Sequence, residues 1–319
     1  MAHLVETMAY VNETPWHGLG QKLAQNQPIE TWLTEAGLDF TIKETDVEFR
    51  VHLPGNSAQH HIFNEQKVLY RSDTLAPLSV VSQRYQVVQP REILEFYRDL
   101  TEVSGFQLET AGVLKAGRKV WALAKTNQSA QIKGNDQMQG YLLLATACDG
   151  SLATTAQFTS VRVVCNNTLA ISLNEANQAI KVPHNTLFDP AQVKAQLGLS
   201  VSSWDDFMYR MKNLAQRRVT ASEAETVIQR IFNPIANQDS SQANSYAMRK
   251  VLDLFNGRGR GAELSSAKST AFGLVNAVTE YVDHYRRARA VDNRLDSAWF
   301  GQGALTKQRA LSRVSALIA

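Results

Sequence analysis

Four apolar segments near the middle of the chain decide the fold: FQLETAGVL (106–114), RKVWALAKT (118–126), GYLLLATAC (140–148) and LATTAQFTSV (152–161). The turn Lys115-Ala116-Gly117 separates the first two segments, and its glycine can supply the positive φ that tight turns often need. Asp149-Gly150-Ser151 separates the last two, and Asp-Gly between two strands is a strong hairpin signal. The sequence therefore predicts two successive hairpins, with TNQSAQIKGNDQ (126–137) as the polar loop between them.

The segments on either side of the hairpins extend this pattern. RVVCNNTLAISLNEA (162–176) is ambiguous at first and helical later, which predicts a helix packed on the sheet. Upstream, FTIKETDVEFRVHL (40–53), KVLYR (67–71) and LSVVS (78–82) have strand patterns. IETWLTEAG (29–37) and REILEFYRDLTEVSG (91–105) have helical spacing.

Beyond the prolines at 183 and 190 the pattern becomes helical. Ser203 and Ser222 are candidate N-caps, and a long helix is expected over 266–290 with apolar residues along one face. We therefore expect an α+β fold, with an antiparallel sheet of hairpins and a packed helix before a helical C-terminal part. The expected regions are 1–176 (sheet-rich), 177–202 (connecting) and 203–319 (helical), and the last is either separate or packed on the first.

Composition excludes several classes of protein. The chain has 319 residues, of which 44% are hydrophobic and 20% are charged. This composition excludes a disordered chain, a collagen-like repeat and a disulfide-stapled miniprotein. No apolar run is long enough to cross a membrane and the N-terminus lacks signal-peptide features, so we expect a cytoplasmic protein without a membrane contact.

Charge is distributed unevenly along the chain. Residues 201–319 hold 17 Lys or Arg against 11 Asp or Glu, whereas residues 1–200 hold 16 against 19. A basic half is consistent with a polyanionic partner such as nucleic acid, although such a split also arises by chance.

The glycine-rich stretch NGRGRG (256–261) is the nearest approach to a phosphate loop. Its glycines would let backbone amides approach a phosphate, and Arg258 and Arg260 add bidentate donors. The alternative is a flexible loop with solvated arginines. No familiar catalytic motif is present, so we predict no catalytic residue, no cofactor and no metal.

Other chemistry-bearing residues have ordinary structural interpretations as well. Cys148 and Cys165 are either nucleophile candidates or buried inert thiols, and Asp149 and His17 are either catalytic or turn residues. Three histidines would form a metal site if the strands brought them together, namely His52, His60 and His61.

Trp121 is flanked at period two by Lys119 and Lys125, which places the three side chains on one strand face. Such a face could stack a base and hold its phosphates. The alternative is a tryptophan covered by lysine stems.

A series of motifs resembles one known family. The motifs are TPWHGLG (14–20), YRSDT (70–74), VSQRYQVVQ (81–89), CDGS (148–151), VRVVCNNTL (161–169), NAVTEYVDH (276–284) and SAWFGQGA (297–304). Over residues 8–310 the chain resembles the phage/plasmid-like protein family, a domain-of-unknown-function family carried by phages and conjugative plasmids. Members often have histidine where Cys148 stands, so this departure weakens a catalytic interpretation. The resemblance implies a setting of DNA entry, replication or recombination.

The order hairpin, hairpin, helix is also similar in outline to the core of phage single-strand annealing proteins, at the level of fold alone. This similarity implies a homo-oligomer that binds single-stranded DNA without a metal or nucleotide. The expected DNA contacts are Lys115, Arg118, Lys119, Trp121, Lys125, Arg162, Arg258 and Arg260. We therefore expect a non-catalytic single-stranded DNA-binding or strand-annealing protein of a mobile element. The alternatives are a protein-binding anti-defence or regulatory factor, and a nucleic-acid-processing enzyme.

Overall fold

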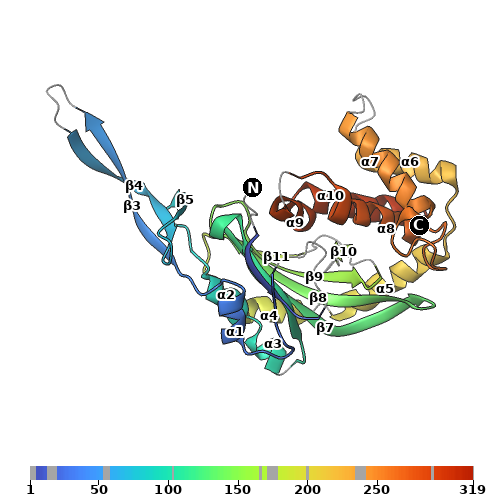
Figure 1. Ribbon diagram of the computed structural model, residues 1–319, viewed down its shortest axis with the longest axis horizontal. Helices are drawn as coiled ribbons and strands as arrows, with labels where there is room; N and C mark the ends of the chain where they lie inside the picture. The colour runs from blue at the N-terminus through green and yellow to red at the C-terminus, as the bar shows by residue number, and fades with distance from the viewer. Residues whose placement is uncertain are drawn as a thin grey trace. The chain divides into compact units, whose positions relative to one another are not determined.

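The computed structural model has the expected α+β architecture, with antiparallel hairpins and a helical C-terminal part (Figure 1). It describes residues 5–12, 20–52, 58–102, 104–164, 167–170, 179–198, 201–233, 242–288 and 291–318. Two compact units make up the chain. Unit 1 comprises residues 1–125, 142–156 and 179–196, and unit 2 comprises residues 126–141, 157–178 and 197–319.

The larger sheet has the strand order β10-β9-β8-β7-β6-β1-β2, with β11 paired to β9. Its strands are β1 (Val5–Tyr10), β2 (Gln21–Lys22), β6 (Gln107–Leu114), β7 (Lys119–Lys133), β8 (Asp136–Ala147), β9 (Thr154–Arg162), β10 (Asn167–Ala170) and β11 (Ile180–Val182). All pairings between these strands for which a register is defined are antiparallel except β1 with β2. The two predicted hairpins are therefore present in the predicted order.

The prediction of a polar loop over 126–137 is wrong. Strands β7 and β8 continue through these residues to a turn at Gly134, whose φ is 59°. Ile132 and Met138 lie on these extensions and are buried in the core of unit 2. Burial of these two side chains explains why a mostly polar stretch forms strands. In the segment 162–176, residues 167–170, where the sequence pattern is ambiguous, form β10. The helix expected later in this segment falls on residues from 171 onward that lie outside the described ones.

The two units are interleaved along the sequence, whereas the regions expected from the sequence were contiguous. Strands β7, β8 and β9 each contribute residues to both units. The segment 177–202, expected as a connection, contains β11 and helix α4 (Pro190–Gly198).

Unit 1 carries a second sheet of three antiparallel strands in the order β3-β4-β5. The strands are β3 (Ile42–His52), β4 (Ala58–Arg71) and β5 (Pro77–Ser82). The turn expected at 54–56 lies outside the described residues.

Three short helices of unit 1 precede β6 in the chain: α1 (Ile29–Glu35), α2 (Pro90–Glu95) and α3 (Arg98–Glu102). Tyr97, between α2 and α3, is fully buried and its hydroxyl donates to the carbonyl oxygens of Ala122 and Leu142 at 3.0 and 2.9 Å. This contact fixes the helical segment against β7 and β8, because a buried hydroxyl without a partner would be costly.

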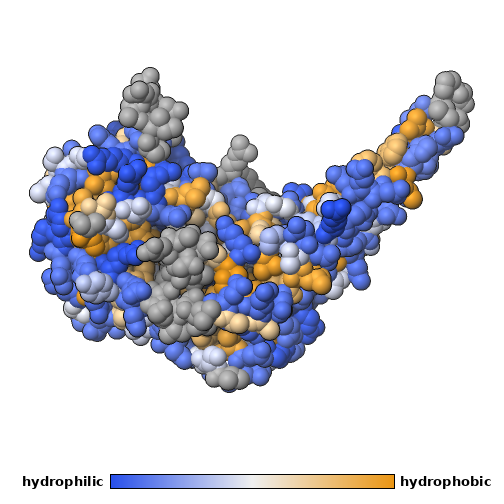
Figure 2. Space-filling view, turned by 180° about the vertical axis from the view of Figure 1, so that it is seen from behind, coloured by the Kyte–Doolittle hydropathy of each residue, from blue (hydrophilic) through white to orange (hydrophobic). Residues whose placement is uncertain are grey.

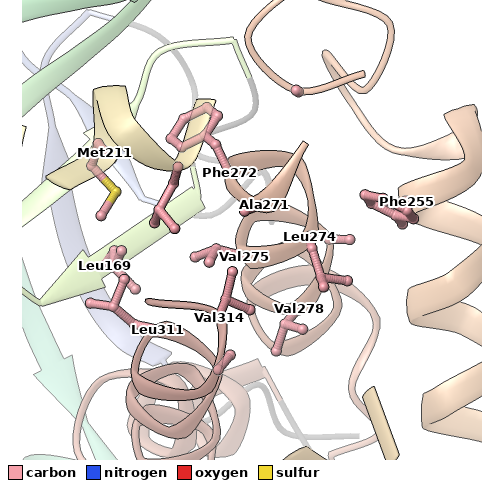
Figure 3. Packing of buried hydrophobic residues seen from close by; sticks show 14 of the residues in the cluster. Leu169, Met211, Phe255, Ala271, Phe272, Leu274, Val275, Val278, Leu311 and Val314 are labelled. Carbon is pink, nitrogen blue, oxygen red and sulfur yellow. The ribbon is translucent and has the colours of Figure 1, made fainter. Parts of the chain in front are cut away.

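Unit 2 is organised around helix α8 (Ala271–Glu280), all of whose residues are buried. Figure 3 shows Leu274, Val275 and Val278 of this helix beside Leu311 and Val314. Leu274, Val275 and Val278 of α8 belong to one apolar cluster with Leu311 and Val314. The other helices of the unit are α5 (Val201–Gln216), α6 (Ala221–Phe232), α7 (Gln242–Asp253), α9 (Val291–Trp299) and α10 (Gln302–Ser315).

The starts of three helices differ from the expected ones. Helix α5 begins at Val201, so Ser203, the expected N-cap, lies within the helix. The long helix begins after Thr270 rather than at Ser266, because the Thr270 hydroxyl accepts the Gly273 N–H at 3.0 Å. Helix α6 is capped by Thr220 rather than Ser222, in a reciprocal capping box with Glu223.

Replacement of Trp121 by Ala should destabilise the protein by about 3–5 kcal/mol, because the indole is 2% exposed and its loss would leave a large cavity. Urea unfolding followed by circular dichroism measures this loss. Arg118→Ala, at an exposed position of the same hairpin, is the matched control and should change stability by less than about 0.5 kcal/mol. Equal effects from the two variants would contradict the buried position of Trp121.

Candidate nucleic-acid interface

The glycine–arginine loop (256–261) follows α7 and lies entirely within unit 2. Gly257 and Gly261 have φ values of 113° and 66°, which L-residues with side chains rarely adopt. Gly259 is needed for a different reason, since a Cβ there would lie 2.8 Å from the carbonyl oxygen of Leu254. The glycines hold the backbone in a tight loop from which Arg258 and Arg260 extend into solvent.

The backbone of this loop does not form a phosphate cradle. The Gly259 N–H donates to the Leu254 carbonyl oxygen, and the Arg260 N–H donates to Glu280 Oε2, both at 3.0 Å. A carboxylate oxygen therefore already accepts an amide that an anion would need. This contradicts the phosphate-loop interpretation of NGRGRG. The groups that an anion could contact are then the exposed side chains of Arg260 and of Arg258, which lies 3.5 Å from the Asp253 carboxylate.

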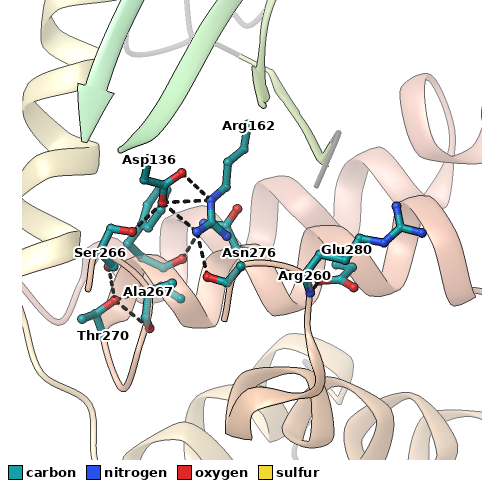
Figure 4. A network of polar contacts seen from close by, with 11 residues as sticks. Asp136, Arg162, Arg260, Ser266, Ala267, Thr270, Asn276 and Glu280 are labelled. Atoms are coloured by element: carbon teal, nitrogen blue, oxygen red, sulfur yellow. Dashed lines mark hydrogen bonds and ion pairs between the residues drawn. The ribbon is translucent and has the colours of Figure 1, made fainter. Parts of the chain in front are cut away.

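A buried ion pair anchors the end of the loop (Figure 4). Arg162 Nη2 lies 2.6 Å from Asp136 Oδ2, and the two side chains are 2% and 0% exposed. The Arg162 guanidinium also donates to the Gly261 carbonyl oxygen at 3.0 Å, and the Ser266 hydroxyl donates to Asp136. Arg162 thus holds the end of the loop through the Gly261 carbonyl oxygen. The prediction that Arg162 contacts DNA is contradicted by its burial.

The hairpin positions expected to bind DNA are only partly accessible. Trp121 and Lys119 are each 2% exposed, which contradicts their roles in stacking and phosphate contact. All residues from 119 to 124 are buried, so this part of β7 is covered on both faces and the alternation of Lys and Trp does not mark a solvent face. Arg118 is exposed, while Lys115 and Lys125 are half-buried.

A second basic feature of unit 2, the arginine pocket, is a concave site of about 300 Å³ lined by Arg286, Arg287, Ala288, Asn293, Arg294 and Ser297. Arg286 and Arg287 follow directly on the π-helical turn Tyr281–Tyr285 that continues α8. Arg294 comes from α9, and its Nη1 donates to the His284 carbonyl oxygen at 3.0 Å. Three arginines from two consecutive segments of the chain therefore line one concavity.

Two tyrosines accompany the arginine pocket. The Arg287 guanidinium lies 5.2 Å from the ring centre of Tyr246, and the Lys250 ammonium lies 4.0 Å from that of Tyr285. Tyr246 and Tyr285 are 38% and 36% exposed as residues. Cations over exposed aromatic rings provide both charge and stacking surface, which together suit a single-stranded nucleic acid.

Lys250 connects the pocket to the glycine–arginine loop. It lies over Tyr285 and is also close enough to the buried Glu280 carboxylate to affect its pKa. Glu280 in turn accepts the Arg260 N–H. The loop and the arginine pocket are therefore neighbouring parts of one unit, and we name them together the basic surface.

The cationic stretch HYRRAR (284–289) is the sequence feature that indicates the pocket. HYRRAR (284–289) complements the dipole at the end of a helix, and that role alone is sufficient to explain its cations. Arg294, eight positions after Arg286, also lines the pocket, and it comes from the next helix along the chain.

Two of the candidate catalytic residues, Cys148 and Asp149, have structural roles. Burial, with a further contribution from Asp149, raises the pKa of the Cys148 thiol to about 12, so the thiol is protonated at neutral pH and a poor nucleophile. The Asp149 carboxylate accepts the Ser151 N–H at 3.0 Å, as in a turn. His17 and Cys165 lie outside the described residues.

The histidine cluster does not form a metal site. His60 and His61 are consecutive strand residues and therefore point to opposite faces, and His61 stacks on Phe49 at 5.3 Å. Within the described ranges, no three His, Cys, Asp or Glu side chains come close enough to hold a metal ion.

The fold and the basic surface define an α+β protein with a candidate surface for polyanions. A family model described as a domain of unknown function (DUF932) matches residues 77–299, well over half of the chain. The chain belongs to this family. No curated protein and no solved structure matches the chain. In the part of the chain that the structure describes, no helix is both long and apolar enough to span a bilayer.

Replacement of Asp136 by Ala should cost about 3–5 kcal/mol of stability, because it leaves the Arg162 guanidinium buried without its counter-ion. Asp253→Ala is the matched control, since Asp253 pairs with Arg258 at 3.5 Å in solvent and such pairs contribute about 0–1 kcal/mol. Chemical unfolding of both variants tests this difference. Similar losses for the two would show that the Asp136 pair does not behave as a buried one.

Replacement of Glu280 by Gln should stabilise the protein at neutral pH and have no effect in acid. Burial raises the pKa of Glu280 above its ordinary value, even though the Arg260 N–H and nearby cations favour the charged form. The unfolded chain therefore ionises first, and the wild type loses stability as pH rises from the ordinary carboxyl pKa through the raised one. Urea unfolding over a pH series measures the gap between the two proteins. A gap that does not change with pH would contradict this assignment.

Proposed function

We propose that this protein is a non-catalytic, single-stranded DNA-binding protein of the strand-annealing type, carried by a mobile genetic element. The observation that carries the proposal is the arginine pocket, where Arg286, Arg287 and Arg294 line one concavity. Guanidinium groups bind phosphate in a bidentate manner and are weakly hydrated, so three arginines around one concavity favour a phosphate-bearing ligand.

The aromatic neighbours favour a single strand over a duplex. Tyr246 and Tyr285 are partly exposed and each already has a cation over its ring. A flexible strand can place its phosphates on the arginines and its bases on the tyrosines, whereas the bases of a duplex are already stacked on each other. Arg258 and Arg260 would extend the phosphate contacts along the basic surface.

The motif series from TPWHGLG to SAWFGQGA supports carriage by a mobile element. The protonated Cys148 thiol and the turn role of Asp149 favour a binding function over catalysis by these residues. Annealing is the process that a basic, single-strand-binding surface with an oligomeric assembly would serve.

A protein-binding role is the second candidate. It is favoured by the exposed apolar side chains on the hairpin of β3 and β4, which include Phe49, Ile62 and Phe63. Such a role predicts a stable protein partner whose capture survives nuclease treatment.

The double variant Arg286→Gln/Arg287→Gln should weaken binding to a labelled single-stranded oligonucleotide in a fluorescence anisotropy titration. The slope of log K against log salt should decrease by about 0.7 for each phosphate that the variant no longer neutralises, because fewer counterions are released. The matched control is Arg210→Gln/Arg230→Gln, which removes the same charge from exposed positions on α5 and α6.

A duplex of the same sequence should bind more weakly than the single strand to the wild type. Absence of wild-type binding at low salt would refute the proposed function. Equal losses of affinity in the two double variants would refute the assignment of the pocket, leaving only non-specific attraction.

A further inference from the structure

The outer part of the hairpin formed by β3 and β4 is exposed on both faces. Every described residue in 48–52 and 58–66 is exposed to solvent. Strand β5 pairs with β4 only between Gln66 and Tyr70, so this outer part has two strands. Figure 2 shows apolar side chains spaced along it. A two-stranded ribbon is marginally stable in water by itself, and a third or fourth strand would support it.

Strand β3 is an edge of its sheet, since the strand order is β3-β4-β5. Its outward N–H and C=O groups form a row that can pair with another strand. Edge strands in natural proteins are commonly blocked by lysine, proline or a covering loop. In residues 44–52 of β3 there is no lysine and no proline, and Phe49 and Val51 are 48% and 37% exposed.

The sequence DVEFRVH (46–52) is complementary to itself when two copies run antiparallel. With Phe49 opposite its own copy, Val47 lies opposite Val51 and Glu48 lies opposite Arg50. The pairing of β3 with β4 is irregular between Asp46 and Glu48, so the central pairs, rather than Asp46 with His52, define this register. Directly opposed residues of antiparallel strands have their Cβ atoms about 4.5–5.5 Å apart, which is close enough for each pair to interact.

We propose that two copies of this chain associate through β3, in antiparallel register centred on Phe49, to form a continuous four-stranded ribbon. The register of β3 with β4 places Phe49 and Val51 on one face with His61, which stacks on Phe49. Opposed residues share a face, so the second copy would extend this apolar face across the two-fold axis. The charged pairs of Glu48 and Arg50 would lie on the other face.

The charges of the ribbon favour a second copy over a nucleic acid. Residues 48–52 and 58–66 contain one arginine, Arg50, against two glutamates, Glu48 and Glu65. A polyanion gains little from such a surface. The acidic half of DVEFRVH and its basic half instead complement each other across a two-fold axis. The interface also shares no residue with the basic surface, so DNA binding and dimerisation can fail independently.

Charge exchange at the two central positions tests the proposal. Glu48→Arg would oppose two guanidinium groups at each of two symmetric pairs, and Arg50→Glu would oppose two carboxylates. Sedimentation equilibrium of the full chain should show a reversible wild-type dimer and dimerisation that is roughly ten- to hundredfold weaker in each single variant. Glu65→Arg, on β4, is the control and should dimerise like the wild type.

An equimolar mixture of the two single variants should recover the dimer, because each arginine of one copy then faces a glutamate of the other. This recovery could not occur if either variant had failed to fold. A wild type that stays monomeric at all accessible concentrations would overturn the proposal. So would single variants that dimerise normally, or a mixture that does not recover.

Discussion

Helix α8 has no side that faces solvent, and the organisation of unit 2 follows from that constraint. A helix that is apolar around its whole circumference is stable only when other elements cover it on all sides. Its polar side chains mostly bond within the helix, as when Asn276 Nδ2 donates to the Phe272 carbonyl oxygen at 2.8 Å. Glu280 at its last position reaches outside the helix, where its carboxylate accepts the Arg260 N–H. The position of the glycine–arginine loop is thus tied to the burial of α8.

Two buried ion pairs connect strands of unit 2 to its helical segments. Arg162 pairs with Asp136 and reaches the Gly261 carbonyl oxygen, 99 residues away in sequence. Lys307 of α10 pairs with Asp283 at 2.8 Å and also donates to the Thr168 hydroxyl. Such pairs contribute little net stability, since desolvation offsets much of the Coulomb attraction. Their hydrogen-bond geometry instead selects one arrangement of strands against helices, because any other would leave a charge buried alone.

Local patterns of the sequence were sufficient for the hairpins and for most of the C-terminal helices. They do not show what covers a strand, so they place the buried residues Lys119, Trp121 and Arg162 on a surface. Alternation distinguishes two faces of β7, but residues distant in sequence decide whether either meets solvent. The polar loop prediction failed for a similar reason, since Ile132 and Met138 find their apolar neighbours in helices that come much later. The arginine pocket depends on Arg294 approaching the end of the helix, which no local pattern specifies.

The interleaving of the two units has a consequence for synthesis on the ribosome. All segments of unit 1 have been made by residue 196, whereas segments 126–141 and 157–178 belong to a unit whose remainder is 197–319. At ordinary elongation rates the later segment takes roughly ten seconds to follow. During that interval Asp136 and Arg162 exist without Ser266 and Gly261, and Ile132 and Met138 without their helical cover. The nascent chain therefore carries an incomplete sheet extension, whose apolar side chains wait for their cover until the C-terminal helices have been made.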